Sequence, residues 1–254
     1  QLPQVDRDEF VFIVQDPFTS FYEAETVADF MALINRLGFK PVLLPFKPNG
    51  KAQHVKGFLA KFAKTAKNTA QFLNNIAELN IPMVGLDASL VLCYRDEYKQ
   101  ILKDKRGDFN VLLSHEWLFA NKDKFARDDI QQQINNSDAK ESIDYKLFAH
   151  CTEKTMLAKS EDQWCDIFTT FGLSLGKIPT GCCGMAGTYG HEVSNYENSK
   201  ALYEMSWQPQ LDKHDRSQIL ATGFSCRSQV KRFEKYKPIH PVTALLQLFE
   251  PVAR

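Results

Sequence analysis

The sequence predicts an α/β fold of two pseudo-symmetric halves, each a parallel sheet with helices on its faces. Three observations lead to this prediction. Short apolar runs of strand length alternate with longer segments whose apolar residues follow a helical spacing. The order strand, helix, strand, helix, strand occurs twice, and such alternation produces parallel sheets. The two copies keep a nearly constant offset, because Gly38 and Gly172 are 134 residues apart, and so are Pro45 and Pro179.

The first half begins with an apolar run at residues 10–14, which is typical of a buried strand. A helix over about residues 23–37 follows, because apolar residues recur there every three or four positions. Gly38 suits the C-terminal cap of this helix. The half continues with a strand at 41–44, a long helical stretch over about 58–76, and a strand at 81–85.

The second half repeats this order from a strand at 145–149. Ser160 and Gln163 form a candidate capping box at the start of a helix that Gly172 ends. A strand at 175–178, a helical stretch around 201–205 and a strand at 219–223 complete the half. Both halves are therefore expected to be Rossmann-like, with ligands bound at the carboxyl ends of the strands.

The expected domain boundaries follow the repeat. Residues 1–120 form a degenerate first repeat, a polar stretch at 121–144 forms the linker, and residues 145–254 form the repeat that carries most of the cysteines. Pro48 and Asn49 stand where the second half has its paired cysteines, and Asp16 stands near the place of Cys151.

Composition narrows the range of functions. Lys plus Arg and Asp plus Glu are both 31, and this balance argues against a nucleic-acid-binding protein. The sequence has no apolar run long enough to span a membrane and no visible signal peptide, so a cytoplasmic location is expected. The chain begins with Gln1 and is interpreted as a piece of a longer protein. Six cysteines in 254 residues favour metal or redox use over a disulfide scaffold.

Cys182 and Cys183 are adjacent in a glycine-rich loop, the most informative feature of the sequence. Gly181, Gly184 and Gly187 allow the backbone of this loop to approach a bound group closely. Four cysteines, the adjacent pair and two more, each lie just after a predicted strand. All four are therefore expected at one edge of the sheet, where they could hold an iron–sulfur cluster. The candidate ligands are Cys151, Cys182, Cys183 and Cys226.

Other uses of these thiols remain open. Four thiolates also suit zinc, although structural zinc sites generally use paired C-x₂₋₄-C spacings that this chain lacks. The cysteines could instead be buried packing residues or reactive thiols, with Cys182 or Cys183 as a nucleophile. The sequence shows no Ser-His-Asp arrangement, no P-loop and no dinucleotide fingerprint, and no catalytic residue is assigned.

The other two cysteines, two histidines and a group of lysines are also assigned. Cys165 falls on the apolar face of a helix and is expected in the core, while Cys93 is either a core residue or a further ligand. His150 and His191 flank the cysteines, and either could support the cofactor or relay protons, although an ordinary surface or core position is favoured; His191 is assigned beside the cofactor. A lysine-rich helix face is expected to be solvated, with docking to an acidic partner as the alternative; it comprises Lys56, Lys61, Lys64 and Lys67.

The cysteine pattern resembles the cysteine-rich CCG domain of heterodisulfide reductase, of glycolate oxidase iron–sulfur subunits and of anaerobic glycerol-3-phosphate dehydrogenase. In that family two repeats each end in C-x-x-C. This chain departs from the pattern: Leu90 replaces the first cysteine of the first pair and leaves Cys93, whereas Cys226 is kept and Gln229 replaces its partner. The resemblance thus implies one cluster rather than two.

Further motifs extend the resemblance over nearly the whole chain. They are Cys93-Tyr-Arg-Asp-Glu-Tyr98, Cys182-Cys-Gly-Met-Ala-Gly-Thr-Tyr-Gly-His-Glu192, Ser206-Trp-Gln-Pro209 and Ala221-Thr-Gly-Phe-Ser-Cys-Arg-Ser-Gln229. These motifs are similar to the C-terminal segment of large bacterial FAD-linked oxidases of the D-2-hydroxyglutarate dehydrogenase type.

This resemblance implies a role in electron transfer. In that family a flavin domain oxidises a 2-hydroxy acid, and a ferredoxin-like region and this cysteine-rich segment follow it. The resemblance implies FAD in the parent enzyme, outside this fragment, a 4Fe-4S cluster near Cys182, and the flavin and ferredoxin-like domains of the same chain as partners. The isolated fragment is expected to be inactive. The alternatives are a docking module with a vestigial or zinc site, or a domain active in thiol–disulfide chemistry.

Overall fold

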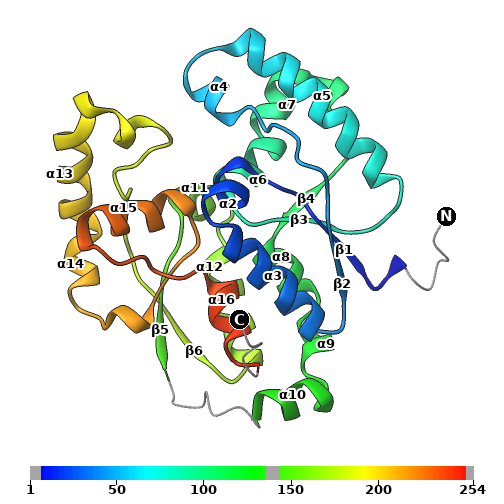
Figure 1. Cartoon of the computed structure of the whole chain (residues 1–254), viewed down its shortest axis with the longest axis vertical. Helices are drawn as coiled ribbons and strands as arrows, with labels where there is room; N and C mark the ends of the chain where they lie inside the picture. Colours follow the sequence, from blue (N-terminus) through cyan, green and yellow to red (C-terminus); the bar gives the residue numbers. More distant parts are fainter. Residues whose placement is uncertain (1–6, 136–142, 250–254) are drawn as a thin grey trace. The chain divides into compact units, whose positions relative to one another are not determined.

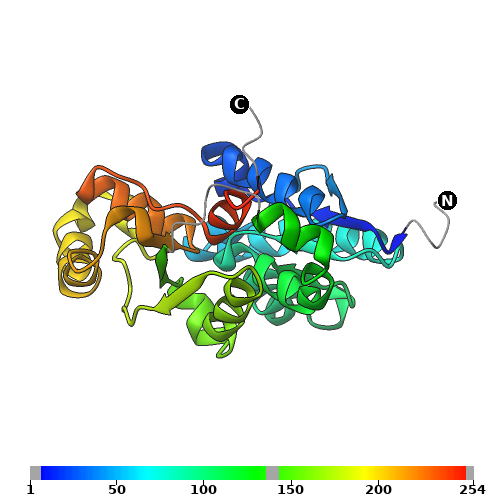
Figure 2. The same ribbon diagram turned by 90° about the horizontal axis from the view of Figure 1, so that it is seen from below.

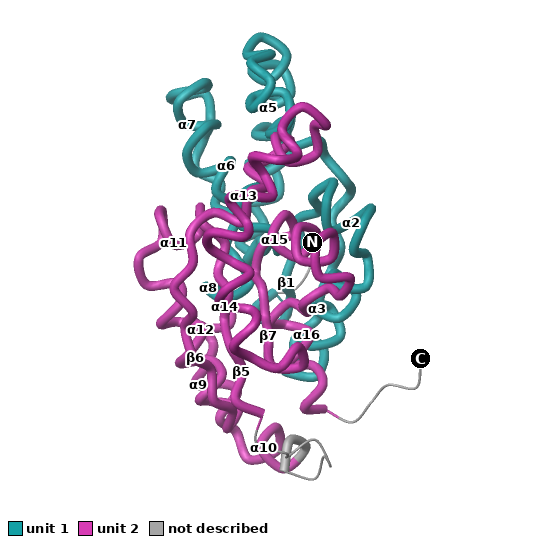
Figure 3. Tube along the Cα trace, turned by 90° about the vertical axis from the view of Figure 1, so that its left-hand side faces the viewer, with its two compact units in different colours: residues 1–117 teal, residues 118–254 magenta. Residues whose placement is uncertain are grey.

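The computed structural model describes residues 7–135 and 143–249. The chain divides into two compact units, unit 1 at residues 1–117 and unit 2 at residues 118–254 (Figure 3). Each unit contains its own parallel sheet flanked by helices, which confirms the expected fold class (Figure 1). Part of the segment expected to be a linker, residues 121–144, is helical and belongs to unit 2.

Within the described residues, unit 1 has a four-stranded sheet in the order β2-β1-β3-β4, and all its strand pairs are parallel. Its strands are β1 (Phe10–Ile13), β2 (Lys40–Leu43), β3 (Met83–Gly85) and β4 (Val111–Leu113). Its helices are α2 (Pro17–Tyr22), α3 (Ala24–Arg36), α4 (Lys51–Val55), α5 (Leu59–Ala77), α6 (Ala88–Arg95), α7 (Glu97–Leu102) and the 3₁₀ helix η1 (Lys103–Arg106). Helix α8 (Ser114–Ala120) spans the division between the units.

The described part of unit 2 has a three-stranded parallel sheet in the order β6-β5-β7. Figure 2 shows α12 and α16 on opposite sides of these strands. The strands are β5 (Asp144–Phe148), β6 (Ser174–Lys177) and β7 (Ile219–Ala221). The helices are α9 (Lys122–Phe125), α10 (Asp128–Asn135), α11 (Cys151–Met156), α12 (Ser160–Thr170), α13 (Tyr196–Ser206), α14 (Gln208–Leu211), α15 (Phe224–Glu234) and α16 (Pro241–Leu246), with 3₁₀ helices η2 (Tyr189–His191), η3 (Val193–Asn195) and η4 (Arg216–Gln218).

The internal repeat is visible in the strand registers. Phe10 pairs with Lys40 in unit 1, and Asp144 pairs with Ser174 in unit 2, so both partners shift by the same 134 residues. The two expected glycine caps are also confirmed: Gly38 and Gly172 follow α3 and α12 with φ of 87° and 73°. Positive φ ends a helix because glycine carries no Cβ to oppose it.

One expectation is wrong, another is made more exact, and one strand was not predicted. The capping box of Ser160 and Gln163 is wrong, because α12 already includes Ser160, and Lys159 at the N-cap makes no side-chain hydrogen bond. Asp16 N-caps α2 just as His150 N-caps α11, so Asp16 is the counterpart of His150, one residue before Cys151. The sequence prediction also omitted β4, which joins the sheet by pairing with β3.

Candidate functional site

Four cysteines gather at the carboxyl ends of the three strands of unit 2. Cys151 is the first residue of α11, directly beyond β5. Cys182 and Cys183 lie in the loop that follows β6, and Cys226 lies in the first turn of α15, beyond β7. Because neighbouring parallel strands end at one edge of a sheet, residues far apart in the sequence meet there.

The four thiols form a continuous series of contacts. Cys151 is in side-chain hydrogen-bonding contact with Cys182, Cys182 with Cys183, and Cys183 with Cys226. Cys151 also lies close enough to Cys226 for their charges to interact. All six cysteines of the chain are free thiols.

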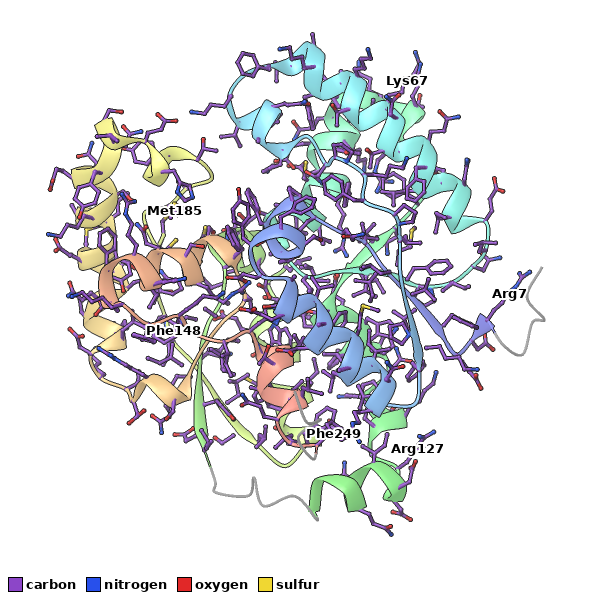
Figure 4. All side chains as sticks on the ribbon, viewed as in Figure 1. Arg7, Lys67, Arg127, Phe148, Met185 and Phe249 are labelled. Carbon is purple, nitrogen blue, oxygen red and sulfur yellow. The ribbon has the colours of Figure 1, made fainter. Side chains whose placement is uncertain are left out.

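This group of sulfurs extends from the core of unit 2 toward its surface. Cys183 and Cys226 are 3% and 1% exposed and belong to an apolar cluster with Phe148 and Met185, both labelled in Figure 4. Cys151 and Cys182 are only half-buried. One side of the group is therefore shielded by packed side chains, while the other side is accessible from solvent.

Hydrogen bonds concentrate negative charge on one of these sulfurs. The thiols of Cys151 and Cys183, followed by the backbone N–H groups of Gly184 and Ala186, lower the pKa of the Cys182 thiol well below its usual range. The Gly184 nitrogen lies 3.4 Å from the Cys182 sulfur. Contact with Cys182 in turn raises the pKa values of Cys151 and Cys183, and burial adds to both increases. Cys182 is thus the thiol that is most readily deprotonated.

The four sulfurs are the candidate ligands for a metal centre. Within residues 7–135 and 143–249, no three His, Cys, Asp or Glu side chains are arranged to hold one metal ion. Thiolates are ligands both of zinc and of iron–sulfur clusters. Hydrogen bonds to the sulfurs, such as the one from the Gly184 N–H to Cys182, are among the contacts by which a protein tunes an iron–sulfur cluster.

The loop after the paired cysteines is packed tightly against α13. Gly184 has φ of 87°, and a Cβ at this position would lie 2.1 Å from the Ser199 carbonyl oxygen. The Ser199 hydroxyl donates to the Gly184 carbonyl at 2.8 Å, and Gln229 Nε2 donates to the Ser199 hydroxyl at 2.8 Å. Gln229 is fully buried one turn after Cys226, so it links α15 to the cysteine loop.

The loop before the paired cysteines is fixed at the Gly181 peptide. The Gly181 N–H donates to the Ser206 hydroxyl at 2.6 Å, and its carbonyl accepts from Trp207 Nε1 at 3.1 Å. Lys154 Nζ donates to the Thr180 carbonyl at 2.5 Å and ties the same loop to α11. These contacts give a structural reason for the Ser206-Trp207 pair that sequence analysis noted only as part of a resemblance.

A buried polar network supports Cys151. His150 Nδ1 accepts from the Thr152 N–H, and its Nε2 lies 3.2 Å from the Ser225 hydroxyl, next to Cys226. The Thr222 hydroxyl accepts from the His150 N–H and donates to Glu153 at 2.6 Å. The network connects the two segments that carry Cys151 and Cys226. Sequence analysis favoured an ordinary role for His150, with support of the cofactor only as the alternative, and did not identify Thr222 or Glu153.

The other predicted residues lie apart from these contacts or at their margin. Gly187 has φ of 68°, as expected for a residue that shapes the loop, and His191 is exposed in η2. The Cys165 thiol donates to the Leu175 carbonyl at 3.3 Å and is half-buried on α12. Cys93 is completely buried in unit 1, where burial and the nearby Glu97 raise the pKa of its thiol. Its role as a further ligand stays a prediction.

The corresponding region of unit 1 is occupied by protein hydrogen bonds. Asn49, the counterpart of Cys183, donates through Nδ2 to the Leu90 carbonyl, and its own carbonyl accepts from the Tyr98 hydroxyl at 2.7 Å. Asp16 is buried beside Asp87; burial, and then repulsion from Asp87, raise the pKa of Asp16 to about 6. Polar residues of this unit therefore form hydrogen bonds within the protein where unit 2 presents thiols.

Comparison with known proteins identifies clear relatives. The chain is 57% identical over 247 residues to D-2-hydroxyglutarate dehydrogenase from Pantoea ananatis, a match that covers 97% of the chain and 23% of the relative. It is 55% identical over 240 residues to the protein of the same name from Escherichia coli K12, covering 94% of the chain and 23% of that relative. A weaker match, 23% identical over 234 residues, covers 91% of the chain and 57% of one of the subunits of anaerobic glycerol-3-phosphate dehydrogenase from Escherichia coli K12.

These matches locate the chain within a longer protein. No family model matches the sequence. The chain spans about a quarter of the length of the first relatives it matches. Over nearly its whole length, this chain is therefore a homologue of the C-terminal part of proteins named D-2-hydroxyglutarate dehydrogenase, and the matching polypeptide of anaerobic glycerol-3-phosphate dehydrogenase is a distant relative.

Proposed function

We propose that this chain is the electron-transfer part of a larger FAD-dependent 2-hydroxy acid dehydrogenase and that it holds an iron–sulfur cluster. One observation carries the proposal: four sulfurs from three separate segments form a continuous series of contacts at the carboxyl end of the unit 2 sheet. Thiols packed only for their apolar character would not require three loops and two backbone N–H groups to converge on them.

The relatives support the wider context. They are named dehydrogenases, and the chain spans 23% of their length, so oxidation of the substrate is assigned to the remaining part of the parent protein. We place FAD there and not in this chain. The substrate of the parent is, by the names of the relatives, a 2-hydroxy acid of the D-2-hydroxyglutarate type.

The cluster ligands would be Cys151, Cys182, Cys183 and Cys226, with Gly181, Gly184 and Gly187 shaping the loop and His191 at its edge. When bound, a 4Fe-4S cluster supplies one-electron redox chemistry. The N–H groups of Gly184 and Ala186 hydrogen-bond to the Cys182 sulfur, which favours its thiolate form. The packed side chains around Cys183 and Cys226 exclude water from one side.

The contacts and exposure of the four cysteines indicate which thiols lose protons when the cluster binds and where electrons leave the chain. Because metals bind thiolates, loading must remove protons from Cys151 and Cys183, whose pKa values are raised, whereas the contacts of Cys182 lower its pKa and favour its thiolate form. The half-buried sulfurs of Cys151 and Cys182 provide the shortest route for electrons to the surface. The acceptor would therefore dock on the side that exposes these two residues.

The decisive experiment is iron and acid-labile sulfide analysis of the chain purified without oxygen, together with its visible and EPR spectra. We expect iron and sulfide in equal amounts in the wild-type chain and their loss in Cys182→Ser. Cys165→Ser is the matched control and should retain both, because Cys165 bonds to the Leu175 carbonyl and not to another thiol. Zinc without iron in the wild-type chain would refute the redox role.

A thiol-active site is the second candidate, and one observation favours it: the Cys182 sulfur contacts two other thiols and two backbone N–H groups, which lower its pKa. A deprotonated cysteine next to a second thiol can attack a disulfide. Mass spectrometry after brief treatment with iodoacetamide distinguishes the two candidates. Rapid alkylation confined to Cys182, in a chain that contains no iron after anaerobic purification, would support thiol chemistry. Protection of all four cysteines by bound iron would support the cluster.

A further inference from the structure

Residues 30–77 have a one-sided charge. This stretch contains eight Lys and Arg residues and no Asp or Glu, although the whole chain has 31 of each charge class. A solvated helix face generally mixes charges of both signs, which stabilise each other across one turn. Such an excess of one sign on a neutral chain indicates a partner of the opposite charge.

The structure shows that helix α5 exposes part of this charge. Lys61, Lys64 and Lys67 repeat at three-residue intervals on its exposed side, and Figure 4 labels Lys67 there. Among the described residues, none of these three lysines forms an ion pair. Like charges at this spacing destabilise a helix by about 0.2–0.5 kcal/mol per pair. An anionic surface would remove that repulsion.

Apolar side chains project beside these lysines, at the turn between α4 and α5. Val55, Phe58 and Leu59 are 45%, 56% and 51% exposed. Gly57, at the centre of the turn, has φ of 76°, and a Cβ built there would meet no atom within 4 Å. The turn therefore projects into open space. We call this turn together with Lys61, Lys64 and Lys67 the basic tip.

We propose that the basic tip binds the surface of anionic phospholipid membranes, independently of the proposed redox function. Phe58 and Leu59 would enter the headgroup region, and the lysines would interact with lipid phosphates. The opposite face of α5 is buried in unit 1 through Phe62, Ala66 and Leu73, so α5 would contact the membrane through the basic tip. No described helix is both long and apolar enough to span a bilayer. Binding would thus be peripheral.

The composition of the tip favours lipid over other anionic partners. Lysine is depleted in protein–protein interfaces, where arginine is enriched, and the tip contains no arginine. Nucleic-acid phosphates would be neutralised by the lysines but would leave the projecting apolar residues without a function. Lysines surrounding exposed Phe and Leu match a membrane interface, where the apolar and cationic groups reach different depths.

Flotation of the full chain with vesicles tests the proposal. We expect binding to vesicles of phosphatidylcholine mixed with phosphatidylglycerol, none to pure phosphatidylcholine, and release by salt. Changing Lys61, Lys64 and Lys67 together to Gln should weaken binding about a hundredfold, at about fivefold for each lysine. Phe58→Ser with Leu59→Ser should weaken it about tenfold, because less apolar surface leaves water.

Two control variants test whether vesicle binding depends on the basic tip itself, and not on the net charge of the chain or on any exposed apolar side chain. Lys99, Lys103 and Lys105 are exposed lysines of the same unit near acidic residues, and their change to Gln should leave vesicle binding within about twofold of wild type. Val193, 92% exposed in unit 2, should tolerate change to Ser without effect.

Three results would overturn the proposal. The first is equal binding to neutral and anionic vesicles, and the second is unchanged binding by the lysine variant of α5. The third is absence of vesicle binding while the wild-type chain binds duplex DNA or polyglutamate; such binding would assign the tip to a nucleic acid or an acidic protein instead.

Discussion

Replacement of Gly184 by Ala tests whether the cysteine loop depends on its close contact with α13. The new Cβ would lie 2.1 Å from the Ser199 carbonyl oxygen, at a backbone φ of 87°. Positive φ costs a non-glycine residue about 1–2 kcal/mol. Moving the loop away from α13 also breaks the buried hydrogen bond from Ser199 to Gly184 and strains its link to Gln229, at about 1–1.5 kcal/mol each. The total loss of unfolding free energy is about 3–5 kcal/mol.

Gly172→Ala is the matched control for backbone strain. Gly172 has φ of 73° in the same unit, but a Cβ there would meet no atom within 4 Å. Gly172→Ala should therefore lower the unfolding free energy only by the cost of positive φ, about 1–2 kcal/mol. Urea unfolding of the metal-free, reduced chain measures both variants through the fluorescence of Trp164 and Trp207, which are buried in unit 2. If Gly184→Ala were no more destabilising than Gly172→Ala, the contact with Ser199 would not hold the loop.

Two further substitutions extend this reasoning to other buried groups. Ser199→Ala removes the hydroxyl that donates to the Gly184 carbonyl and accepts from Gln229, so unit 2 should lose about 2–3 kcal/mol of unfolding free energy. Iron added to the variant should also be lost to a chelator faster than from the wild-type chain. If the unfolding free energy and the rate of iron loss both stayed at the wild-type values, this role of Ser199 would be contradicted. In unit 1, burial and then Asp87 raise the pKa of Asp16 from 3.8 to about 6, so its stabilising contribution is fully present below about pH 4 and disappears as the pH rises through about 6. On acidification from pH 7 to 4, the unfolding free energy of wild-type unit 1 should therefore rise by about 2 kcal/mol relative to that of Asp16→Asn. The amide of the variant still accepts from the Phe18 and Thr19 N–H groups but cannot titrate. Urea unfolding at both pH values measures this difference, and parallel pH profiles would contradict the raised pKa.

The sequence determined most of the local structure, because local structure depends on residues close together in the chain. The apolar runs predicted strands that the structure places within one or two residues of the expected bounds, as in β1 and β5. Gly38 and Gly172 marked helix ends because positive φ is a property of a single residue. The constant offset of 134 residues predicted two related sheets, and the registers of β1 and β5 preserve it.

Other local predictions failed where tertiary packing overrides a short pattern. Ser160 had the spacing of a capping box, yet it is buried inside α12, where its hydroxyl has no hydrogen-bond partner among the described residues. Three residues, Val111–Leu113, form β4 because the neighbouring strand β3 pairs with them. Neither outcome can be read from propensity alone, because each depends on segments distant in the sequence.

The sequence alone identified the cysteines and the sheet edge on which they would lie, since each follows a strand of a parallel sheet. Only the tertiary structure decided which thiol receives the hydrogen bonds, that Cys183 and Cys226 are buried while Cys151 and Cys182 reach the surface, and that Gln229 and Ser199 hold the loop. The physical reason is distance: hydrogen bonds and burial act over a few ångströms in space, and residues 30 or more positions apart come within that range only after the chain has folded.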